Sequence, residues 1–468
     1  MFVLHVAYTS GAILDDAYIS FRYARNLALG HGLVFNPGER VEGYTNFTWV
    51  LLAAAFLRVG LDAAWVMPLV GVACGIAVVI VTARGARALA ADTDDAHPLA
   101  GVPAAAIVAL SPSLAFYAGT GLETALFTLL CAIAGLAVAR RRPLPFALAA
   151  GVAFLTRPEA ALLGLAGLVA LALGQDGRRA VTIAAGGLAL LVGPYLAFKL
   201  LYFGALLPNT LAAKPPQLSE GAAYVGWALP EIAGLLVTAL LGWRSRGRRT
   251  LLALWALMTV SVVLEGGDWM PCQRMLVPWL PWLAMAADRP LLSLFQLPRV
   301  RRDAWRPLLL VVSLAYAPLA LLDSPGLRET AASIAAYDPV RAQIAHELWD
   351  AGVRSVGTVD IGLLGYRDPD LRVLDLGGLT DRQVGGALGP HLDKDVPIDV
   401  LQARAPDAFL LLSRVPPLPD TSGVVRAAGF YGTERHVMAT PWFGRSYHFR
   451  TSFELRPDYY MLWFERAS

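Results

Sequence analysis

Long apolar stretches dominate this chain and constrain its fold more than any other feature. One helical crossing of a bilayer needs about 20 consecutive apolar residues, and stretches of this kind recur along the first two thirds of the sequence. The pattern predicts an α-helical polytopic membrane protein. Crossings are predicted near 65–83, 99–117, 122–139, 143–156, 159–174, 180–203, 222–242, 250–265, 275–291 and 307–323, of which 143–156 and 159–174 are short.

The composition supports a membrane protein. Hydrophobic residues make up 56% of the chain and charged residues only 16%, whereas a soluble protein carries roughly 25% charged residues. The net charge of +3 is too small to indicate a nucleic-acid partner. Cys74 and Cys131 lie inside apolar stretches and Cys272 in a polar gap, so no disulfide framework is expected. No nucleotide-binding loop and no metal-spaced His or Cys cluster occurs, which disfavours a soluble nucleotide-sugar donor.

Basic clusters occupy every second gap between the predicted crossings. Cytoplasmic loops carry an excess of Lys and Arg, so these gaps are predicted to face the cytoplasm. The clusters lie at 84–87, 140–142, 178–179, 244–249 and 299–306. The remaining gaps gather carboxylate, amide, Trp and Pro residues, which places the chemistry of the chain on the outer face.

The segment before the first crossing is predicted to form outer juxtamembrane helices, over about 15–61. Ala17 to Leu29 reads as a helix with Asp15 or Asp16 as its N-cap and Gly30 after its end. A full crossing at 47–61 would invert every later loop, so that stretch is predicted to be an interfacial or re-entrant helix. Its Trp49 suits the membrane interface. Residues 1–14 are too few to cross a bilayer and do not read as a signal peptide.

The character of the chain changes near residue 323. Short apolar runs of strand length at 353–359, 371–376 and 408–412 are separated by helix-like segments such as 340–351. This alternation predicts a small α/β domain. The expected organisation is a transmembrane domain over 1–323 and an extracytoplasmic α/β domain over 324–468.

Asp15 and Asp16 form the sharpest candidate for chemistry. Adjacent carboxylates repel, so one of them is expected to have a raised pKa or to meet a cation. A carboxylate of this kind suits a general base that takes a proton from an acceptor hydroxyl. The alternative is an ordinary helix N-cap with a solvated neighbour.

Two further outer gaps carry carboxylates beside apolar crossings. Asp268 lies in the stretch 265–270, where two glycines permit a tight backbone and Trp269 offers a flat face for a sugar or an isoprenoid. Charged groups next to a crossing are costly unless they are used. Glu123 begins another crossing, and its alternative role is to stabilise the N-terminal dipole of that helix.

Three outer cations are candidates to hold a phosphate, by charge rather than by motif. They are Arg157, Lys214 and Arg274, since arginine binds phosphate through paired donors and lysine as a point charge. A simpler interpretation of Arg157 is an ion pair with Glu159.

These motifs resemble those of a known family. The stretches 15–27 and 32–46 resemble the first outer loop of bacterial GT-C glycosyltransferases, multi-span enzymes that take sugar from a polyprenyl-phosphate donor. The gaps around Glu123, Arg157, Asn209 and Asp268 extend the resemblance, and 362–366 matches weakly. Within this fold the chain looks most like the mycobacterial terminal β-(1→2)-arabinofuranosyltransferases.

The resemblance implies both a reaction and a set of site residues. The first acidic residue of the first outer loop, catalytic in that pattern, falls on Asp15, with Asp16 beside it. The second-loop carboxylate falls on Glu123 and the Gly-Gly-Asp element on Asp268. A divalent ion bridging Asp15, Glu123 or Asp268 and the phosphate is left open. Substrate contacts are predicted at Arg22, Tyr44, Asn46, Asn209 and Trp269.

The implied enzyme sits in a bacterial plasma membrane and moves a sugar, with arabinofuranose favoured, to a cell-envelope glycan on the outer face. A general base suits inversion, whereas retention would require another role for the carboxylates, such as nucleophile. One alternative is a same-fold transferase acting on lipid or protein. Another is a carrier that moves a lipid-linked sugar without chemistry, although a carrier more often shows repeat symmetry and buried polar residues at mid-membrane.

Overall fold

The computed structural model describes residues 1–9, 11–92, 97–215, 217–295, 316–419, 425–426 and 429–467. The chain divides into two compact units. The first unit comprises Met1–Gly11, Met67–Ala197 and Pro216–Ala331, and the second comprises Ala12–Val66, Phe198–Pro215 and Ala332–Ser468. Packing therefore groups the first outer loop with the C-terminal region, and the sequence-based division at residue 323 stays a prediction.

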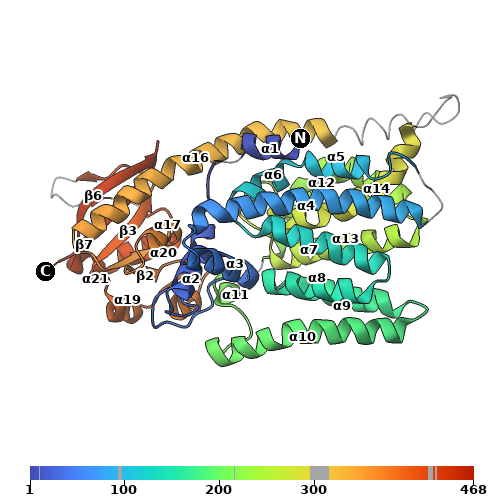
Figure 1. Ribbon diagram of the computed structural model, residues 1–468. Helices are drawn as coiled ribbons and strands as arrows, with labels where there is room; N and C mark the ends of the chain where they lie inside the picture. Colours follow the sequence, from blue (N-terminus) through green and yellow to red (C-terminus); the bar gives the residue numbers. More distant parts are fainter. Residues whose placement is uncertain are drawn as a thin grey trace. The chain divides into compact units, whose positions relative to one another are not determined.

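The first unit is helical, and α7, α8 and α13 lie side by side in it (Figure 1). Its core is built largely from alanine and leucine, small and medium side chains that let helices approach closely. The helices of this unit are α1 (Phe2–Thr9), α4 (Ala63–Ala91), α5 (Val102–Ala109), α6 (Pro112–Gly119), α7 (Thr124–Ala139), α8 (Pro143–Thr156), α9 (Ala160–Ala172), α10 (Gly177–Phe203), α12 (Leu218–Leu241), α13 (Arg246–Glu265), the 3₁₀ turn η1 (Arg274–Trp279), α14 (Leu280–Phe295) and the start of α16 (Tyr316–Asp350).

The predicted apolar crossings correspond to these helices with two differences. In the described part of the chain, four helices are long and apolar enough to cross a membrane: α4, α10, α12 and α13. Helices α7, α8 and α9 are shorter apolar helices. The predicted crossing 275–291 begins with the turn η1 rather than with α-helix. The basic cluster 299–306 and residues 307–315 of the last predicted crossing lie outside the described residues.

The predicted crossing 99–117 is broken into α5 and α6, which meet at an angle of 58°. Proline lacks the backbone N–H that would continue a helix, and Pro112 stands at the first position of α6. The Ser111 hydroxyl caps the new helix by accepting a hydrogen bond from Leu114 N at 3.2 Å. The pair is long and apolar enough to count as one broken span or as a re-entrant loop, so a crossing at this segment stays a prediction.

The second unit contains a five-stranded mixed sheet in the order β2-β1-β3-β7-β6. Strand β1 (Ser355–Thr358) pairs in parallel with β2 (Arg372–Asp375) and β3 (Ala408–Ser413). Antiparallel pairing joins β3 to β7 (Tyr459–Arg466) and β7 to β6 (Tyr447–Arg456). Every residue of β3 is buried, as expected for a central strand covered on both faces. The three strands predicted from apolar runs are confirmed.

The second unit also contains short helices from the C-terminal region and from earlier segments of the chain. Five of them follow β1 in the sequence: α17 (Gly362–Arg367), α18 (Arg382–Gly385), α19 (Ile398–Arg404), α20 (Gly432–Ala439) and α21 (Pro441–Ser446). Three come from earlier segments: α2 (Asp15–Ala28), α3 (Phe47–Arg58) and α11 (Asn209–Ala213). Helix α2 packs against both α3 and α17.

Two details of the first outer loop differ from the sequence prediction. Helix α2 starts at Asp15, so Leu14 occupies the N-cap position and neither aspartate caps the helix. Trp49 is buried among protein side chains and is not a contact for lipid headgroups. The predicted end of the first helix is confirmed, because Gly30 follows α2 with a φ of +86°. Helix α3 has 12 residues, too few for a complete crossing.

Candidate functional site

Asp15 is held by the main chain of the C-terminal region. Its Oδ2 accepts a hydrogen bond from Gly362 N at 2.9 Å, and its Oδ1 accepts one from Leu363 N at 2.9 Å. These amides belong to the first turn of α17, where helix N–H groups lack intrahelical partners. A Cβ atom on Gly362 would collide with Asp15. The stretch 362–366, which gave the weak part of the family resemblance, thus positions the predicted catalytic carboxylate.

An arginine and a second carboxylate accompany Asp15. Arg341, on α16, lies with Nη1 3.8 Å from Asp15 Oδ1 and donates from Nη2 to Asp360 Oδ2 at 2.5 Å. Burial raises the pKa of Asp15 to about 6, Arg341 opposes this rise and Asp360 adds to it. A carboxyl group with a pKa near 6 is ionised at neutral pH and can accept a proton. Asp16 is partly exposed in the first turn of α2.

A buried group of charges occupies the first unit, where three inter-helix gaps meet. Arg157, directly after α8, donates from Nε and Nη2 to Glu159 Oε1 at 3.1 and 2.7 Å. Its Nη1 lies 3.6 Å from Glu123 Oε1, at the start of α7. The expected pair of Arg157 with Glu159 is confirmed, and Glu123 shares the same cation.

Asp268 and Arg274 complete this group, which we call the charge cluster: Glu123, Arg157, Glu159, Asp268 and Arg274. Arg274 Nη2 lies 2.6 Å from Asp268 Oδ2. Gly266 and Gly267 have φ values of +91° and +73°, a backbone region that glycine enters without steric cost. These glycines turn the chain after α13. Trp269 is 68% exposed and remains available for an external ligand.

Two donors in the charge cluster suggest a ligand. Arg157 Nη1 and Arg274 Nε are buried and make no hydrogen bond within the described residues. Burial acts to lower the pKa of Arg157, but Glu159 and Glu123 outweigh it and raise the pKa. Both arginines therefore stay charged. Buried donors without partners cost free energy, and an anion entering the cluster would satisfy them.

Three predicted substrate contacts are buried in the second unit. Arg22 is 1% exposed and donates to the carbonyl oxygens of Phe35, Gly365 and Leu371 at 2.6 to 2.8 Å. Asn46 exchanges hydrogen bonds with the Ser20 hydroxyl, and Tyr44 packs edge-on against Tyr23. These contacts describe side chains that fix the first outer loop, and substrate binding by them stays a prediction.

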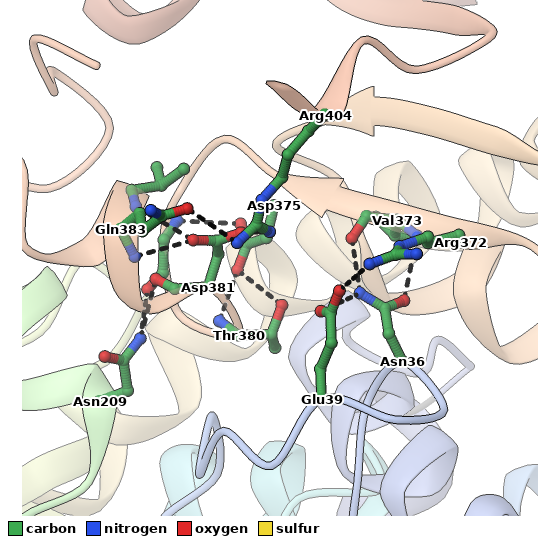
Figure 2. A network of polar contacts seen from close by, with 12 residues as sticks. Asn36, Glu39, Asn209, Arg372, Val373, Asp375, Thr380, Asp381, Gln383 and Arg404 are labelled. Atoms are coloured by element: carbon green, nitrogen blue, oxygen red, sulfur yellow. Dashed lines mark hydrogen bonds and ion pairs between the residues drawn. The ribbon is translucent and has the colours of Figure 1, made fainter. Parts of the chain in front are cut away.

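Asn209 belongs to a network of polar contacts in the second unit (Figure 2). Its amide nitrogen donates to the carbonyl oxygens of Gly378, Leu379 and Asp381 at 2.7 to 3.1 Å. The loop that it grips is folded around Asp375, which accepts hydrogen bonds from Gly377 N, Gly378 N, Thr380 N and Thr380 Oγ1. Burial raises the pKa of Asp375 to about 6, although the bonds from Thr380 oppose the rise.

A pocket of about 460 Å³ adjoins Asn209. Glu42, Phe203 and Arg382 are among its lining residues, and Arg382 Nη2 is anchored by the carbonyl oxygens of Arg40 and Phe203. Lys214, the third predicted phosphate ligand, ends α11 in the same unit. It acts with burial to lower the pKa of His391 to about 3.

The structure therefore brings together Glu123, Arg157, Asp268 and Arg274 in the first unit, whereas Asp15, Asn209 and Lys214 belong to the second. Within the described residues, no group of three His, Cys, Asp or Glu side chains is arranged to hold a metal ion. A divalent ion that bridges Asp15, Glu123 or Asp268 and the phosphate stays a hypothesis.

Sequence reasoning missed Arg341, Asp360 and Asp375. Asp360 had a usable signal, because it lies two residues after Thr358, the last residue of β1, and two residues before Gly362. Arg341 had none, since it resembles any charged residue on a long helix. Asp375 stands at the end of β2 before a Gly-Gly pair, the kind of turn that a carboxylate organises by accepting amide hydrogen bonds.

Comparison with solved structures decides the fold. The crystal structure of ArnT from Cupriavidus metallidurans bound to undecaprenyl phosphate matches all of this chain and 96% of that chain, with a TM-score of 0.58 and 13% identity. The apo state matches with a TM-score of 0.56. The chain has the GT-C fold. With its apolar helices, this fold makes the chain a multi-pass membrane protein, and the predicted fold class is confirmed.

Curated relatives share sequence as well as fold. The terminal β-(1→2)-arabinofuranosyltransferase of Mycobacterium tuberculosis is 34% identical over 239 residues, which cover 46% of this chain and 37% of that protein. The enzyme of the same name from Corynebacterium glutamicum is 29% identical over 340 residues, 59% of this chain and 48% of that protein. The chain thus spans less than half the length of the curated relatives that it matches.

The C-terminal region also matches a family model on its own. Residues 327–464 match a domain of unknown function, DUF8728. This range contains the five-stranded sheet except for the last two residues of β7, together with Arg341, Asp360 and the first turn of α17.

Proposed function

We propose that this chain is a membrane glycosyltransferase that moves a sugar, with arabinofuranose favoured, from a polyprenyl-phosphate donor to a cell-envelope glycan on the outer face of a bacterial plasma membrane. The single observation that carries the proposal is the charge cluster. It holds two arginines with unsatisfied donors among three carboxylates, beside apolar helices in a GT-C fold. The names of the sequence relatives and the undecaprenyl phosphate bound to ArnT support the donor class.

The charge cluster is assigned to the donor phosphate. As the bond between the sugar and the phosphate breaks, negative charge grows on the leaving phosphate. Arg157 Nη1 and Arg274 Nε would donate to it, which stabilises this charge in a water-poor environment. Glu123, Glu159 and Asp268 hold the two guanidinium groups in place and keep phosphate binding weak enough for release. Trp269 is assigned to the sugar or the isoprenoid.

Asp15 is assigned the role of general base for the acceptor hydroxyl. Its two amide hydrogen bonds leave lone pairs on both carboxylate oxygens, and its pKa near 6 suits removal of a proton from the attacking hydroxyl. Asp16 would orient the acceptor or Asp15. Asp360 holds Arg341 beside Asp15, so this arginine limits the rise of the Asp15 pKa and keeps the base ionised.

Donor consumption tests the proposal. Membranes containing the chain are incubated with radiolabelled polyprenyl-phosphate arabinofuranose and an arabinan acceptor, and sugar transfer and free polyprenyl phosphate are measured together. For a transferase we expect one sugar transferred to the acceptor for each polyprenyl phosphate released. Movement of intact donor across the bilayer without cleavage would instead indicate a carrier. Transfer of the labelled sugar to protein or lipid in place of the arabinan would indicate the same-fold alternative.

A further inference from the structure

An apolar groove lies on the first unit, between α7, α9 and α13. Its volume is about 590 Å³. Leu165 and Val169 on α9 are 63% and 61% exposed, and Leu257 on α13 is exposed as well. In a multi-pass membrane protein such a surface meets lipid chains. The groove is lined in part by Leu162, Leu165, Val169, Trp243, Leu254 and Leu257.

Three arginines line one end of this groove: Arg141, Arg246 and Arg249. Arg141 Nη2 and Arg246 Nη2 both donate to the carbonyl oxygen of Leu173, at 3.4 and 3.0 Å. One acceptor thus holds two like charges together. Among the residues that the structure describes, none of these three arginines forms an ion pair with a carboxylate. The end of the groove carries uncompensated positive charge.

The position of these arginines carries a structural cost. Arg246 and Arg249 stand in the first turn of α13, where the helix dipole favours anions and disfavours cations. Ser245 occupies the N-cap of that helix without a side-chain hydrogen bond. An anion placed here would offset both unfavourable features, because helix N-termini bind anions through their free amides.

Arg141 is set in place by two further features. Its φ is +55°, a left-handed conformation that is unfavourable for a non-glycine residue. Gly174 makes room for it, since a Cβ atom there would collide with the Arg141 guanidinium. An alanine at 174 would therefore displace the Arg141 side chain without removing its charge.

We propose that this groove binds an anionic glycerophospholipid, with its phosphate among Arg141, Arg246 and Arg249 and an acyl chain along the apolar wall. Basic pockets between transmembrane helices recognise lipid headgroups in this way. The site is distinct from the charge cluster. Helix α7 has 16 residues and separates Glu123 from Arg141 by about 24 Å. The arginine distribution predicts that the groove faces the cytoplasmic leaflet.

Lipid competition tests this site. The purified chain in zwitterionic nanodiscs is titrated with phosphatidylglycerol or phosphatidylcholine, and bound lipid is counted by native mass spectrometry. We expect a preference of roughly tenfold for phosphatidylglycerol. That preference should disappear in the double variant Arg246→Gln/Arg249→Gln and weaken in Gly174→Ala. It should persist in Arg178→Gln/Arg179→Gln, whose exposed side chains do not line the groove.

Three results would overturn the proposal. They are equal retention of both lipids, an equal loss of preference in the Arg178/Arg179 control, and displacement of phosphatidylglycerol by stoichiometric polyprenyl phosphate. Each variant is first checked for its elution volume and melting temperature in detergent. If a glutamine variant fails to fold, Arg246→Lys takes its place. This variant retains the positive charge and should keep most of the preference for phosphatidylglycerol. The outcome is independent of sugar transfer.

Discussion

Asp15 Oδ1 accepts a hydrogen bond from Leu363 N at 2.9 Å, although 348 residues separate the two in the sequence. Gly362 N donates a second hydrogen bond, to Asp15 Oδ2, so two main-chain amides hold this one carboxylate. A side chain predicted to be catalytic is thus oriented by main-chain groups of a different part of the chain. The C-terminal domain consequently helps to set the geometry of the predicted base, and several predictions depend on this relationship.

The variant Gly362→Ala tests whether the two amide hydrogen bonds position Asp15 for catalysis. Its Cβ atom would collide with the carboxylate and backbone of Asp15, so the predicted base should move. A misplacement of about 1 Å can cost roughly 100-fold in rate, and we expect a loss of this size in sugar transfer with normal membrane insertion. Gly444→Ala is the matched control, because a Cβ atom there meets no other atom within 4 Å. Equal activity of the two variants would show that the hydrogen bonds from the α17 amides to Asp15 are not needed for transfer.

The variant Asp15→Asn tests the raised pKa through stability. Burial raises the Asp15 pKa to about 6 in the folded chain, above the value of about 3.9 in an unfolded chain. The ionised group therefore disfavours folding above pH 6, and this cost fades as the pH falls toward 4. The free energy of unfolding of Asp15→Asn relative to the parent should shift in favour of the variant between pH 4 and pH 8. A pH-independent difference would contradict the raised pKa.

The rate of transfer should follow the same titration. A general base must be ionised, so transfer by the parent chain should fall as the pH drops below about 6. Asp15→Asn should lose two or more orders of magnitude, roughly the contribution of a general base. Its residual rate should lack the acidic limb. An unchanged acidic limb in this variant would assign the titration to another group.

Much of the fold could be predicted from the sequence, because the spacing of apolar side chains indicates which residues are buried. The runs around Val356, Val373 and Leu410 predicted β1, β2 and β3, and paired opposite charges predicted the contact of Arg157 with Glu159. The amides that hold Asp15 could not be predicted, since main-chain donors leave no side-chain signal. The burial of Trp49 was also missed. Its apolar neighbours look the same whether a lipid or another part of the protein covers them.

The variant Arg157→Lys tests donor binding by the charge cluster. Lysine keeps the charge but cannot reproduce the paired donation from Nε and Nη2 to Glu159 or the donor at Nη1. We expect the KM for the polyprenyl-phosphate donor to rise by roughly tenfold or more, with insertion unchanged. The control is Arg178→Lys, an exposed arginine in a gap predicted to be cytoplasmic. A fall in kcat at unchanged KM would argue against a donor contact.

Reporter fusions test the topology on which the outer-face assignment depends. Reporters fused after Arg142 and Arg248 are expected in the cytoplasm, and reporters after Lys214 and Ser333 outside. The reason is the alternation of basic and acidic gaps along the chain. A cytoplasmic signal after Ser333 would overturn both the number of crossings and the position of the C-terminal domain.

The most direct test of the glycosyltransferase assignment is a single-turnover reaction of the purified chain in nanodiscs. Polyprenyl-phosphate arabinofuranose labelled in the sugar is mixed with an arabinan acceptor, and both products are quantified. The proposal predicts one labelled acceptor for each polyprenyl phosphate released, with both products lost in Asp15→Asn and in an Arg157→Lys/Arg274→Lys double variant. Quantitative recovery of intact donor from an inserted, correctly folded parent chain, across a panel of polyprenyl-phosphate pentoses and hexoses, would contradict the assignment.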